Sequence, residues 1–400
     1  MWIEDIVKVA KNEIKKIVRD TNLLALFFLG PVFYPVLYGL IYIDKVETRV
    51  PIGIMDADNS SLSRGLIREF NSHQNLKIDK VLYSEQEVEN YLKLQNGNAV
   101  VMIPADFSMK IYNKERAGIE LFLSPNRLLV VSDIGFPISQ LANYYSTKIS
   151  AKLLESKGVP AARYKYLLSP INIKFINLFN PYIAYGDMVL SLLFTMILIQ
   201  VMTVASATSS AKEWDSKWMN TFNASKNPLI IFFGKYFIII SIYIISSILV
   251  FLLWVPIFDI HLAAKSLNLL LVMIVTLSSS AAFGLFLGTF FRHKITVLLF
   301  AGFLTYPFFF SSGVVWPEQQ LPMIIQYIGY TLPTTPALRS IFFMGQMGAN
   351  MSIIQNYLII GGLQFMIYSI LYMLRIHKIK DLSLKSNENI DNKDLIVDNN

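Results

Sequence analysis

The chain has 400 residues, of which 54% are hydrophobic and only 16% are charged, and it contains no cysteine. This composition lies far from that of a soluble globular domain and predicts a membrane protein. Without cysteine, disulfides, thiolate nucleophiles and cysteine-ligated metals are excluded. The net charge of +7 does not gather in one basic stripe, so a membrane topology explains it better than a nucleic-acid partner. The 4 histidines show no metal-ligand spacing, so no metal site is predicted.

The N-terminal region predicts a surface helix followed by a membrane span. Residues 1–20 repeat apolar positions at helical spacing with lysines on other faces, which is typical of an amphipathic helix in the inner membrane interface. Residues 21–43 carry no charge and are long enough to cross a hydrocarbon core of ~30 Å. Because no small-x-small site follows this long run, we expect an uncleaved transmembrane helix 1.

Residues 44–185 have the character of a folded, water-exposed domain. Alternating strands and helices predict a small α/β domain inserted between transmembrane helices 1 and 2. The predicted strands are 50–55, 76–82, 99–103, 118–123 and a late one at 171–176, and the predicted helices are 62–71, 84–95 and 128–157. No nucleophile–base pair or metal loop stands out, so we expect a binding or gating role.

Charge-free runs between residues 186 and 375 predict transmembrane helices 2–6. They are 188–211, 229–258, 267–291, 295–315 and 353–374. With helix 1 these make a polytopic α-helical membrane protein with six transmembrane helices. Lysine and arginine concentrate in residues 1–20, 212–227, 292–294 and 375–378, so both termini are expected in the cytoplasm and the α/β domain outside it.

The small and charged residues within the spans indicate close helix packing and give no sign of an ion-binding or catalytic site. Gly284 and Gly288 form a G-x-x-x-G pattern that lets two helices approach closely. Lys235 stands six residues into the third span and is predicted to extend to the cytoplasmic interface. Few other ionisable residues are expected at membrane depth, which argues against an ion-coupled transporter.

The last third of the chain holds an interrupted segment and a polar tail. Prolines break residues 316–339, which predicts two short helices at the outer interface as an external re-entrant segment. Residues 376–400 are rich in Asn and Asp and are predicted to be a disordered cytoplasmic tail.

In the order of its elements, nearly the whole chain resembles the permease subunits of type-2 ABC exporters, in the subgroup with a large extracytoplasmic domain after the first helix. Three local patterns carry the resemblance. They are the first-strand segment 50–56 with Asn59, Ser63 and Arg64; Lys212-Glu213 leading to Ser225, Pro228 and Gly234-Lys235; and the late series Ser312-Gly313, Trp316-Pro317, Leu321-Pro322, Pro333 and Arg339.

The resemblance implies a homo- or heterodimeric permease in a bacterial cytoplasmic (inner) membrane, with a cytoplasmic ABC ATPase on each half and a periplasmic adaptor as a further candidate partner. The chain has no G-x-x-x-x-G-K-[ST] motif, so ATP and Mg are expected on the ATPase, and the chain itself is predicted not to be an enzyme. Lys217-Trp218 stands where the family usually has a Gly-Thr pair, and a divergent half of a heterodimer is one interpretation of that departure.

In this interpretation, residues 212–227 form a coupling segment that docks into a groove of the ATPase. The candidate contact residues are Glu213, Trp214, Asp215, Lys217, Trp218, Met219, Phe222 and Ser225. The aromatic ones would be the main anchors. The expected cargo is a hydrophobic or amphiphilic molecule, such as a drug or lipid, moved out of the cytoplasm or inner leaflet. Two alternatives stay open. One is a membrane-anchored binding or assembly protein whose external domain recruits a partner. The other is a membrane enzyme that acts on lipids, although no group of His, Asp and Glu residues in the sequence supports it.

Overall fold

The computed structural model divides the chain into two compact units, which we describe separately. One unit comprises Met1–Lys45 with Asn177–Asn400, and the other is Val46–Ile176. The structure describes residues 2–43, 48–93, 97–113, 115–124, 128–161, 163–164, 185–211, 225, 227–264 and 266–397.

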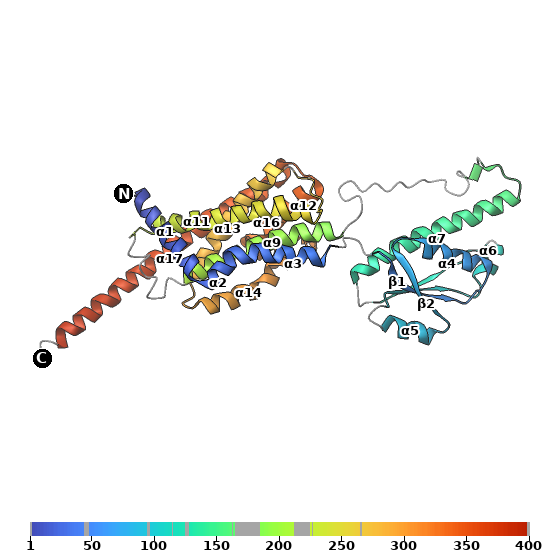
Figure 1. Cartoon of the computed structure of the whole chain (residues 1–400), viewed down its shortest axis with the longest axis horizontal. Coiled ribbons are helices and arrows are strands. Elements are labelled where there is room, and N and C mark those ends of the chain that lie inside the picture. The colour runs from blue at the N-terminus through green and yellow to red at the C-terminus, as the bar shows by residue number, and fades with distance from the viewer. Residues whose placement is uncertain are drawn as a thin grey trace. The chain divides into compact units, whose positions relative to one another are not determined.

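The first unit is a bundle of apolar helices (Figure 1). Its elements are α1 (Trp2–Arg19), α2 (Thr21–Leu24), the π-helical turn η1 (Ala25–Leu29), α3 (Gly30–Ile41), α9 (Tyr185–Ala211), α11 (Pro228–Leu249), η4 (Val250–Trp254), α12 (Val255–Ile257), α13 (Ser266–Gly288), α14 (Lys294–Phe310), η5 (Glu318–Gln320), α15 (Met323–Thr331), α16 (Thr334–Ile341), η6 (Phe342–Gln346) and α17 (Met351–Val397).

Five stretches of this unit are long and apolar enough to cross a membrane. They are Thr21–Ile41, Gly186–Ala211, Pro228–Ile257, Leu267–Gly288 and Met351–Ile379. The second of these forms the centre of the bundle, because α9 contacts α3, α13, α14 and α16 (Figure 1). In the most apolar 18-residue stretch of this span, 78% is buried, whereas only 22% of the corresponding stretch of Met351–Ile379 is buried.

Two buried threonine hydroxyl groups of α9 form hydrogen bonds within their own helix. Thr195 donates to the carbonyl of Ser191 at 2.9 Å, and Thr203 donates to the carbonyl of Ile199 at 2.8 Å. These bonds satisfy hydroxyls that have no water to bind within an apolar bundle. Such bonds lower the cost of burying a threonine in the core of the bundle.

The predicted span 295–315 is shorter in the structure. α14 ends at Phe310 after 17 residues, where the Ser311 N–H bonds the carbonyl of Pro307 and Gly313 takes a φ of +74°. Glycine tolerates this left-handed conformation, which turns the chain away from the helix.

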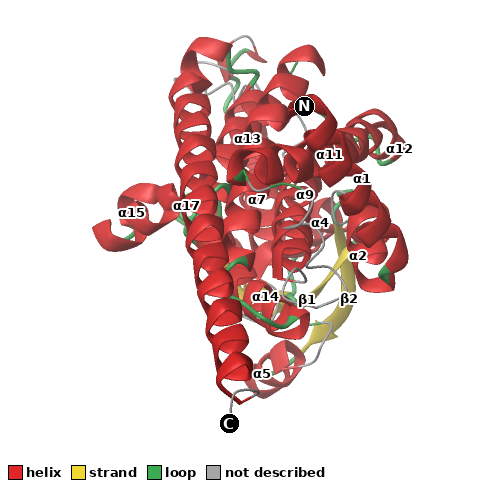
Figure 2. Cartoon of the chain, turned by 90° about the vertical axis from the view of Figure 1, so that its left-hand side faces the viewer, coloured by secondary structure: helices red, strands yellow, loops and turns green. Residues whose placement is uncertain are grey.

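The tail also differs from the sequence-based expectation. Figure 2 shows α17 as one unbroken helix, and it runs to Val397, whereas we predicted disorder from residue 376. No glycine or proline follows Gly362, so the sequence holds no helix breaker that would end α17 earlier.

The second unit contains a four-stranded mixed sheet in the order β2-β1-β3-β4. The strands are β1 (Val50–Asp56), β2 (Leu76–Leu82), β3 (Ala99–Ile103) and β4 (Glu120–Leu123). β1 pairs in parallel with β2 and β3, and β4 is antiparallel to β3. These elements closely follow the strands expected from the sequence, while the late strand at 171–176 falls outside the described residues.

Helices cover both faces of this sheet (Figure 1). α4 (Ser61–Ser72), α6 (Phe107–Tyr112) and α7 (Leu128–Ser156) pack on the face that carries Ile52, Ile54 and Val101. α5 (Glu85–Lys93) packs on the opposite face through Val88 and Tyr91. The central strands β1 and β3 are therefore mostly buried, as is usual for parallel strands, whereas β2 and β4 at the edges are largely exposed.

Candidate functional site

Two helix ends bracket the predicted coupling segment 212–227. α9 ends at Ala211 and α11 begins at Pro228. Asn227 caps α11 by accepting a bond from the Leu229 N–H at 3.0 Å, and proline at the first helical position suits that start. Buried Ser225 accepts a bond from the Asn227 N–H at 3.2 Å. The other predicted contact residues lie outside the described residues: Glu213, Trp214, Asp215, Lys217, Trp218, Met219 and Phe222.

A buried group of polar side chains, which we call the anchor cluster, joins both of these helix ends to α1. It consists of Glu13, Lys16, Ser209 and Lys235, all of them at most 1% exposed. The Nζ of Lys16 lies 2.7 Å from Oε2 of Glu13 and donates to the carbonyl of Ser209 at 3.0 Å. The Nζ of Lys235 lies 3.1 Å from the same Oε2 and 3.4 Å from Oγ of Ser209. Ser209 also donates to Oε1 of Glu13.

Electrostatics hold the anchor cluster together. Burial would raise the pKa of Glu13, but the charges of Lys16 and Lys235 and the bonds from Lys16 and Ser209 lower it from 4.5 to about 2. A buried charge without partners is strongly unfavourable. Glu13 is therefore ionised in the folded protein, and removing it would leave two buried lysines without this carboxylate.

A close helix contact brings the cluster's members together. Gly234 faces α1 so closely that an added Cβ would lie 2.7 Å from Cβ of Val9 and 3.1 Å from the carbonyl oxygen of Ile6. Only a glycine lets α1 approach α11 to this distance. The next residue on α11 is Lys235, which thereby reaches Glu13. The sequence placed Lys235 within reach of the cytoplasmic interface, and the structure shows its side chain buried beside a carboxylate 222 residues away in sequence.

A second ion pair ties the same N-terminal region to α14. Asp20 ends α1 and caps α2 by accepting bonds from the N–H groups of Asn22 at 2.9 Å and Leu23 at 3.2 Å. Its other oxygen lies 3.3 Å from Nζ of Lys294, the first residue of α14. The junction of α1 and α2 is thus attached to helices from three later parts of the chain.

The predicted small-residue pair packs α13 against α9. An added Cβ on Gly284 would lie 2.5 Å from the carbonyl oxygen of Thr203, and one on Gly288 would lie 2.2 Å from that of Ala207. These are backbone atoms of α9, which cannot move aside. The two glycines therefore define how closely the helices pack.

At another place in the bundle, three residues predicted for the re-entrant segment meet two further residues around Arg339. We call this the arginine cluster: Ser312, Gly313, Glu318, Tyr330 and Arg339. Arg339 donates to the carbonyl of Ser312 at 2.8 Å, to the hydroxyl of Tyr330 at 3.1 Å and to the carboxylate of Glu318. Tyr330 donates to Oε1 of Glu318 at 2.9 Å. Arginine is suited to this role because its planar group offers several fixed donors.

The ionisation of Glu318 and the small size of Gly313 both favour the contacts of the arginine cluster. Burial would raise the pKa of Glu318, but bonds from Arg339 and Tyr330 hold it below its ordinary value. Burial and the bond to Glu318 raise the pKa of Tyr330 to about 12. An added Cβ on Gly313 would lie 1.9 Å from Nη2 of Arg339, so the arginine fills the space that a larger residue would need.

The predicted prolines precede the short helices around this cluster. Pro317, Pro322 and Pro333 stand immediately before η5, α15 and α16. The two short helices expected here are α15 and α16, and their placement at the outer interface stays a prediction. All 8 residues of α16 are buried, and it contacts α9, α13 and α17 within the bundle.

Sequence reasoning missed the partners in both clusters. Glu13 and Lys16 share a helix face with Val9 and Ile17, because positions 9, 13, 16 and 17 recur at helical spacing. Two charges on an otherwise apolar face were a signal of a buried pair. Glu318 and Tyr330 gave no comparable signal, since their meeting depends on the path of the chain between α14 and α16.

The fold and these sites define a polytopic membrane protein whose helices are tied together by buried polar clusters. Residues 22–374 match the family described as "ABC-2 family transporter protein", and the chain belongs to that family. It is therefore an ABC transporter permease, and family membership implies association with an ATPase subunit and a membrane.

Two relatives carry the same name. The chain is 22% identical over 326 residues to "Probable multidrug ABC transporter permease YbhR" of Escherichia coli (strain K12), covering 81% of this chain and 84% of that protein. The protein of that name from Escherichia coli O157:H7 matches with the same identity and coverage.

Proposed function

We propose that the chain is the permease subunit of an ATP-driven exporter that moves a hydrophobic or amphiphilic molecule out of the cytoplasm or the inner leaflet. ATP is hydrolysed on a separate cytoplasmic subunit, and two permease chains assemble into the working transporter. The family match supports transport, and the word "multidrug" in the relative's name supports a drug-like cargo.

The proposed topology has six spans in a bacterial cytoplasmic membrane. α14 is the sixth; its 17 residues give a helix of ~26 Å, close to the ~30 Å hydrocarbon core. The positions of lysine and arginine support cytoplasmic termini and an extracytoplasmic α/β unit.

The anchor cluster is the observation that carries the proposal. Segment 212–227 connects α9 to α11. Glu13 of α1 contacts Ser209, which precedes the segment on α9, and Lys235, which follows it on α11. A force applied to the segment would therefore reach α1, α9 and α11 together. When nucleotide binding closes two ATPase subunits, such a unit would move as a rigid body and change how the helices pack.

Partner binding through the coupling segment can be tested directly. The double variant Trp218→Ala with Phe222→Ala should insert in the membrane but lose its ATPase in a pull-down, because each aromatic anchor contributes about 2 kcal/mol or more, or roughly 30-fold in affinity. Trp316→Ala, which removes an exposed tryptophan from the predicted external segment, is the matched control and should bind normally.

The same pull-down separates the exporter from the alternative of a membrane-anchored assembly protein. Wild-type retention of the ATPase by the double variant would refute the coupling role of the segment. A wild-type chain that never associates with an ATPase would favour the assembly protein.

The orientation has its own test, which the cysteine-free chain makes simple. Single cysteines at Lys110 and Asn126 should react with an impermeant thiol reagent in intact spheroplasts, and cysteines at Lys217 and Lys294 should react only after lysis. The reverse pattern would place the α/β unit in the cytoplasm and remove the basis for coupling.

A further inference from the structure

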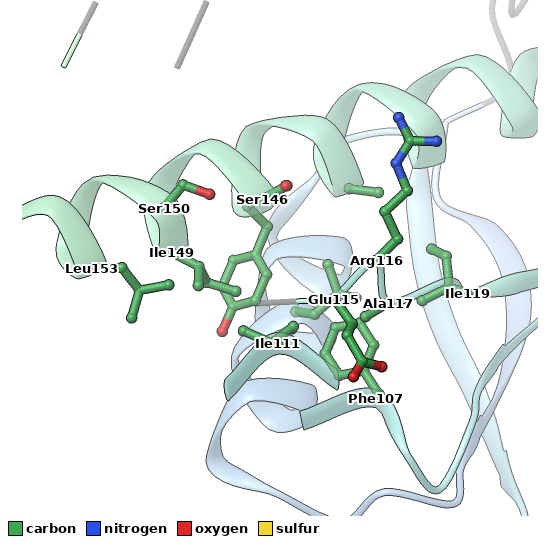
Figure 3. Close-up of a pocket in the computed structure, with 13 residues that line it drawn as sticks. Phe107, Ile111, Glu115, Arg116, Ala117, Ile119, Ser146, Ile149, Ser150 and Leu153 are labelled. Atoms are coloured by element: carbon green, nitrogen blue, oxygen red, sulfur yellow. The ribbon is translucent and has the colours of Figure 1, made fainter. Parts of the chain in front are cut away.

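The α/β unit contains a pocket with a volume of about 390 Å³ (Figure 3). One wall is α7, the opposite wall is α6 with residues 115–119, and Leu66 of α4 also lines the pocket. The volume is within the range that proteins use for small organic ligands. Neither transport by the bundle nor coupling to an ATPase accounts for a pocket here.

Most of the pocket lining is apolar. Aliphatic and aromatic side chains come from four separate segments of the unit: Leu66, Phe107, Ile111, Ile119, Ile149 and Leu153. Several of them are partly exposed although they adjoin the buried core of the sheet. Apolar surface that a ligand could cover contributes roughly 25 cal/mol per Å² to binding, before the costs of association are subtracted.

Close contacts fix the α7 wall. The hydroxyl of Tyr145 donates to the carbonyl of Leu62 at 2.9 Å. The ring lies so near Gly65 that an added Cβ there would be 2.0 Å from the tyrosine oxygen. Tyr145 is thereby held between α7 and α4, and the pocket exists without a ligand. A preformed pocket loses less entropy when it binds.

Two charged side chains of opposite sign line the pocket. Glu115 and Arg116 both line it, and Figure 3 shows the Arg116 side chain extending toward α7. Nearby, Nζ of Lys110 forms an ion pair with Asp106 at 2.6 Å. Within the described part of the chain, Arg116 makes no ion pair.

Two hydroxyl groups complete the polar side of the pocket. Ser146 and Ser150 lie one helical turn apart on the α7 wall, in line with Ile149 and Leu153. Hydroxyls can donate to an anionic oxygen, and a guanidinium binds one through charge-assisted bonds. The pocket therefore combines an apolar lining with two hydroxyl groups, the guanidinium of Arg116 and the carboxylate of Glu115.

We propose that this pocket binds a single-chain anionic amphiphile, with its apolar tail against Phe107, Ile111 and Ile149 and its anionic head at Arg116. The binding site is a property of the α/β unit, and it goes beyond the exporter function proposed above. A site of this kind would let the unit hold an amphiphilic carboxylate outside the helical bundle.

Protection of an introduced cysteine from a thiol reagent tests the proposal on the full chain in lipid nanodiscs. Ser150→Cys places the only thiol in the pocket, and Thr147→Cys places it on an exposed part of the same helix as the matched control. The probes are decanoate and decyltrimethylammonium, whose tails match and whose heads carry opposite charges. Both are used below their micelle-forming concentrations.

Decanoate should slow the labelling of Ser150→Cys about tenfold when its free concentration is about ten times its Kd, because only empty pockets react. It should leave the labelling of Thr147→Cys unchanged, and decyltrimethylammonium should protect neither site. Adding Arg116→Gln to Ser150→Cys should abolish protection by decanoate; Arg116 is exposed, so the fold is expected to tolerate the change.

Three outcomes would overturn the proposal: no protection by decanoate, equal protection by the cationic probe, or full protection in the Arg116→Gln background. Because the measurement involves neither ATPase nor transport, its failure leaves the exporter function untouched. Failure of the exporter function would likewise leave this binding result standing.

Discussion

The ammonium group of Lys235 lies 3.1 Å from the carboxylate of Glu13, although 222 residues separate the two in sequence. Lys235 belongs to the second turn of α11, and Glu13 belongs to α1. With Lys16 and Ser209, this pair connects the N-terminal helix to the helices on both sides of the coupling segment. If residues 212–227 bind the ATPase as proposed, this arrangement would make α1 part of the mechanical path between the ATPase and the bundle.

Removing the carboxylate of the anchor cluster should destabilise the protein strongly. In Glu13→Gln, Lys16 and Lys235 lose the buried carboxylate they share, and breaking a buried pair typically costs about 3–5 kcal/mol. Glu4→Gln makes the same change at an exposed position of the same helix and should cost little. Thermal unfolding of the two purified variants measures the difference, and equal melting temperatures would contradict the account of the cluster.

The same carboxylate predicts how stability depends on pH. The pKa of Glu13 is about 2 in the folded chain and 4.5 ordinarily, so its contribution is complete above pH 4.5 and is lost as the pH falls from 4.5 toward 2. The gap in melting temperature between the wild type and Glu13→Gln should therefore narrow between about pH 6 and about pH 3. A gap that stays constant or widens on acidification would mean that Glu13 is not held ionised by the two lysines.

The arginine cluster predicts an unusually sensitive glycine. Gly313→Ala forces a side chain into a left-handed backbone position and against Arg339, and should destabilise by about 1–3 kcal/mol. Gly302→Ala in α14 is the control, because an added Cβ there meets no atom within 4 Å and alanine favours helix by roughly 0.5–1 kcal/mol. Denaturation in detergent should rank Gly302→Ala above the wild type and Gly313→Ala below it, and the opposite ranking would contradict the geometry.

The packing of α13 on α9 predicts a similar contrast. Gly284→Ala would bring a methyl group to 2.5 Å from the backbone of Thr203, so the helices must separate, and overpacking of this kind costs about 1–3 kcal/mol. Gly362→Ala in α17 adds the same methyl group where no atom lies within 4 Å. Comparing the thermal stability of the two variants tests the packing; if Gly284→Ala were as stable as Gly362→Ala, the close approach would be wrong.

The sequence was informative wherever a signal repeats along the chain. Uncharged runs located the five long spans, and β-branched runs with turn residues located β1, β2 and β3, because both patterns reflect burial of neighbouring residues. The residues around Arg339 were identified one by one, but their contacts with Glu318 and Tyr330 were not.

Pairings between distant residues escaped sequence reasoning for a physical reason. Lys235 alone in an apolar run has the pattern of a lysine that extends to the interface, and only its packing against α1 shows that it is buried. Gly234 makes that packing possible, yet its neighbour Val9 is far away in the chain. In the tail, polar composition predicted disorder, whereas the structure continues α17 to Val397.

The most direct test of the central claim is the rate of ATP hydrolysis that transport substrate stimulates in the assembled complex, measured for a charge exchange in the anchor cluster. Glu13→Lys and Lys235→Glu should each retain the ATPase in a pull-down but lose stimulated hydrolysis, because each disrupts the link between α1 and α11. The double variant restores one carboxylate between two lysines and should recover a large part of the rate. Wild-type stimulation in both single variants, or a double variant that regains stability without regaining stimulation, would show that the cluster only stabilises the fold and does not transmit the ATPase motion.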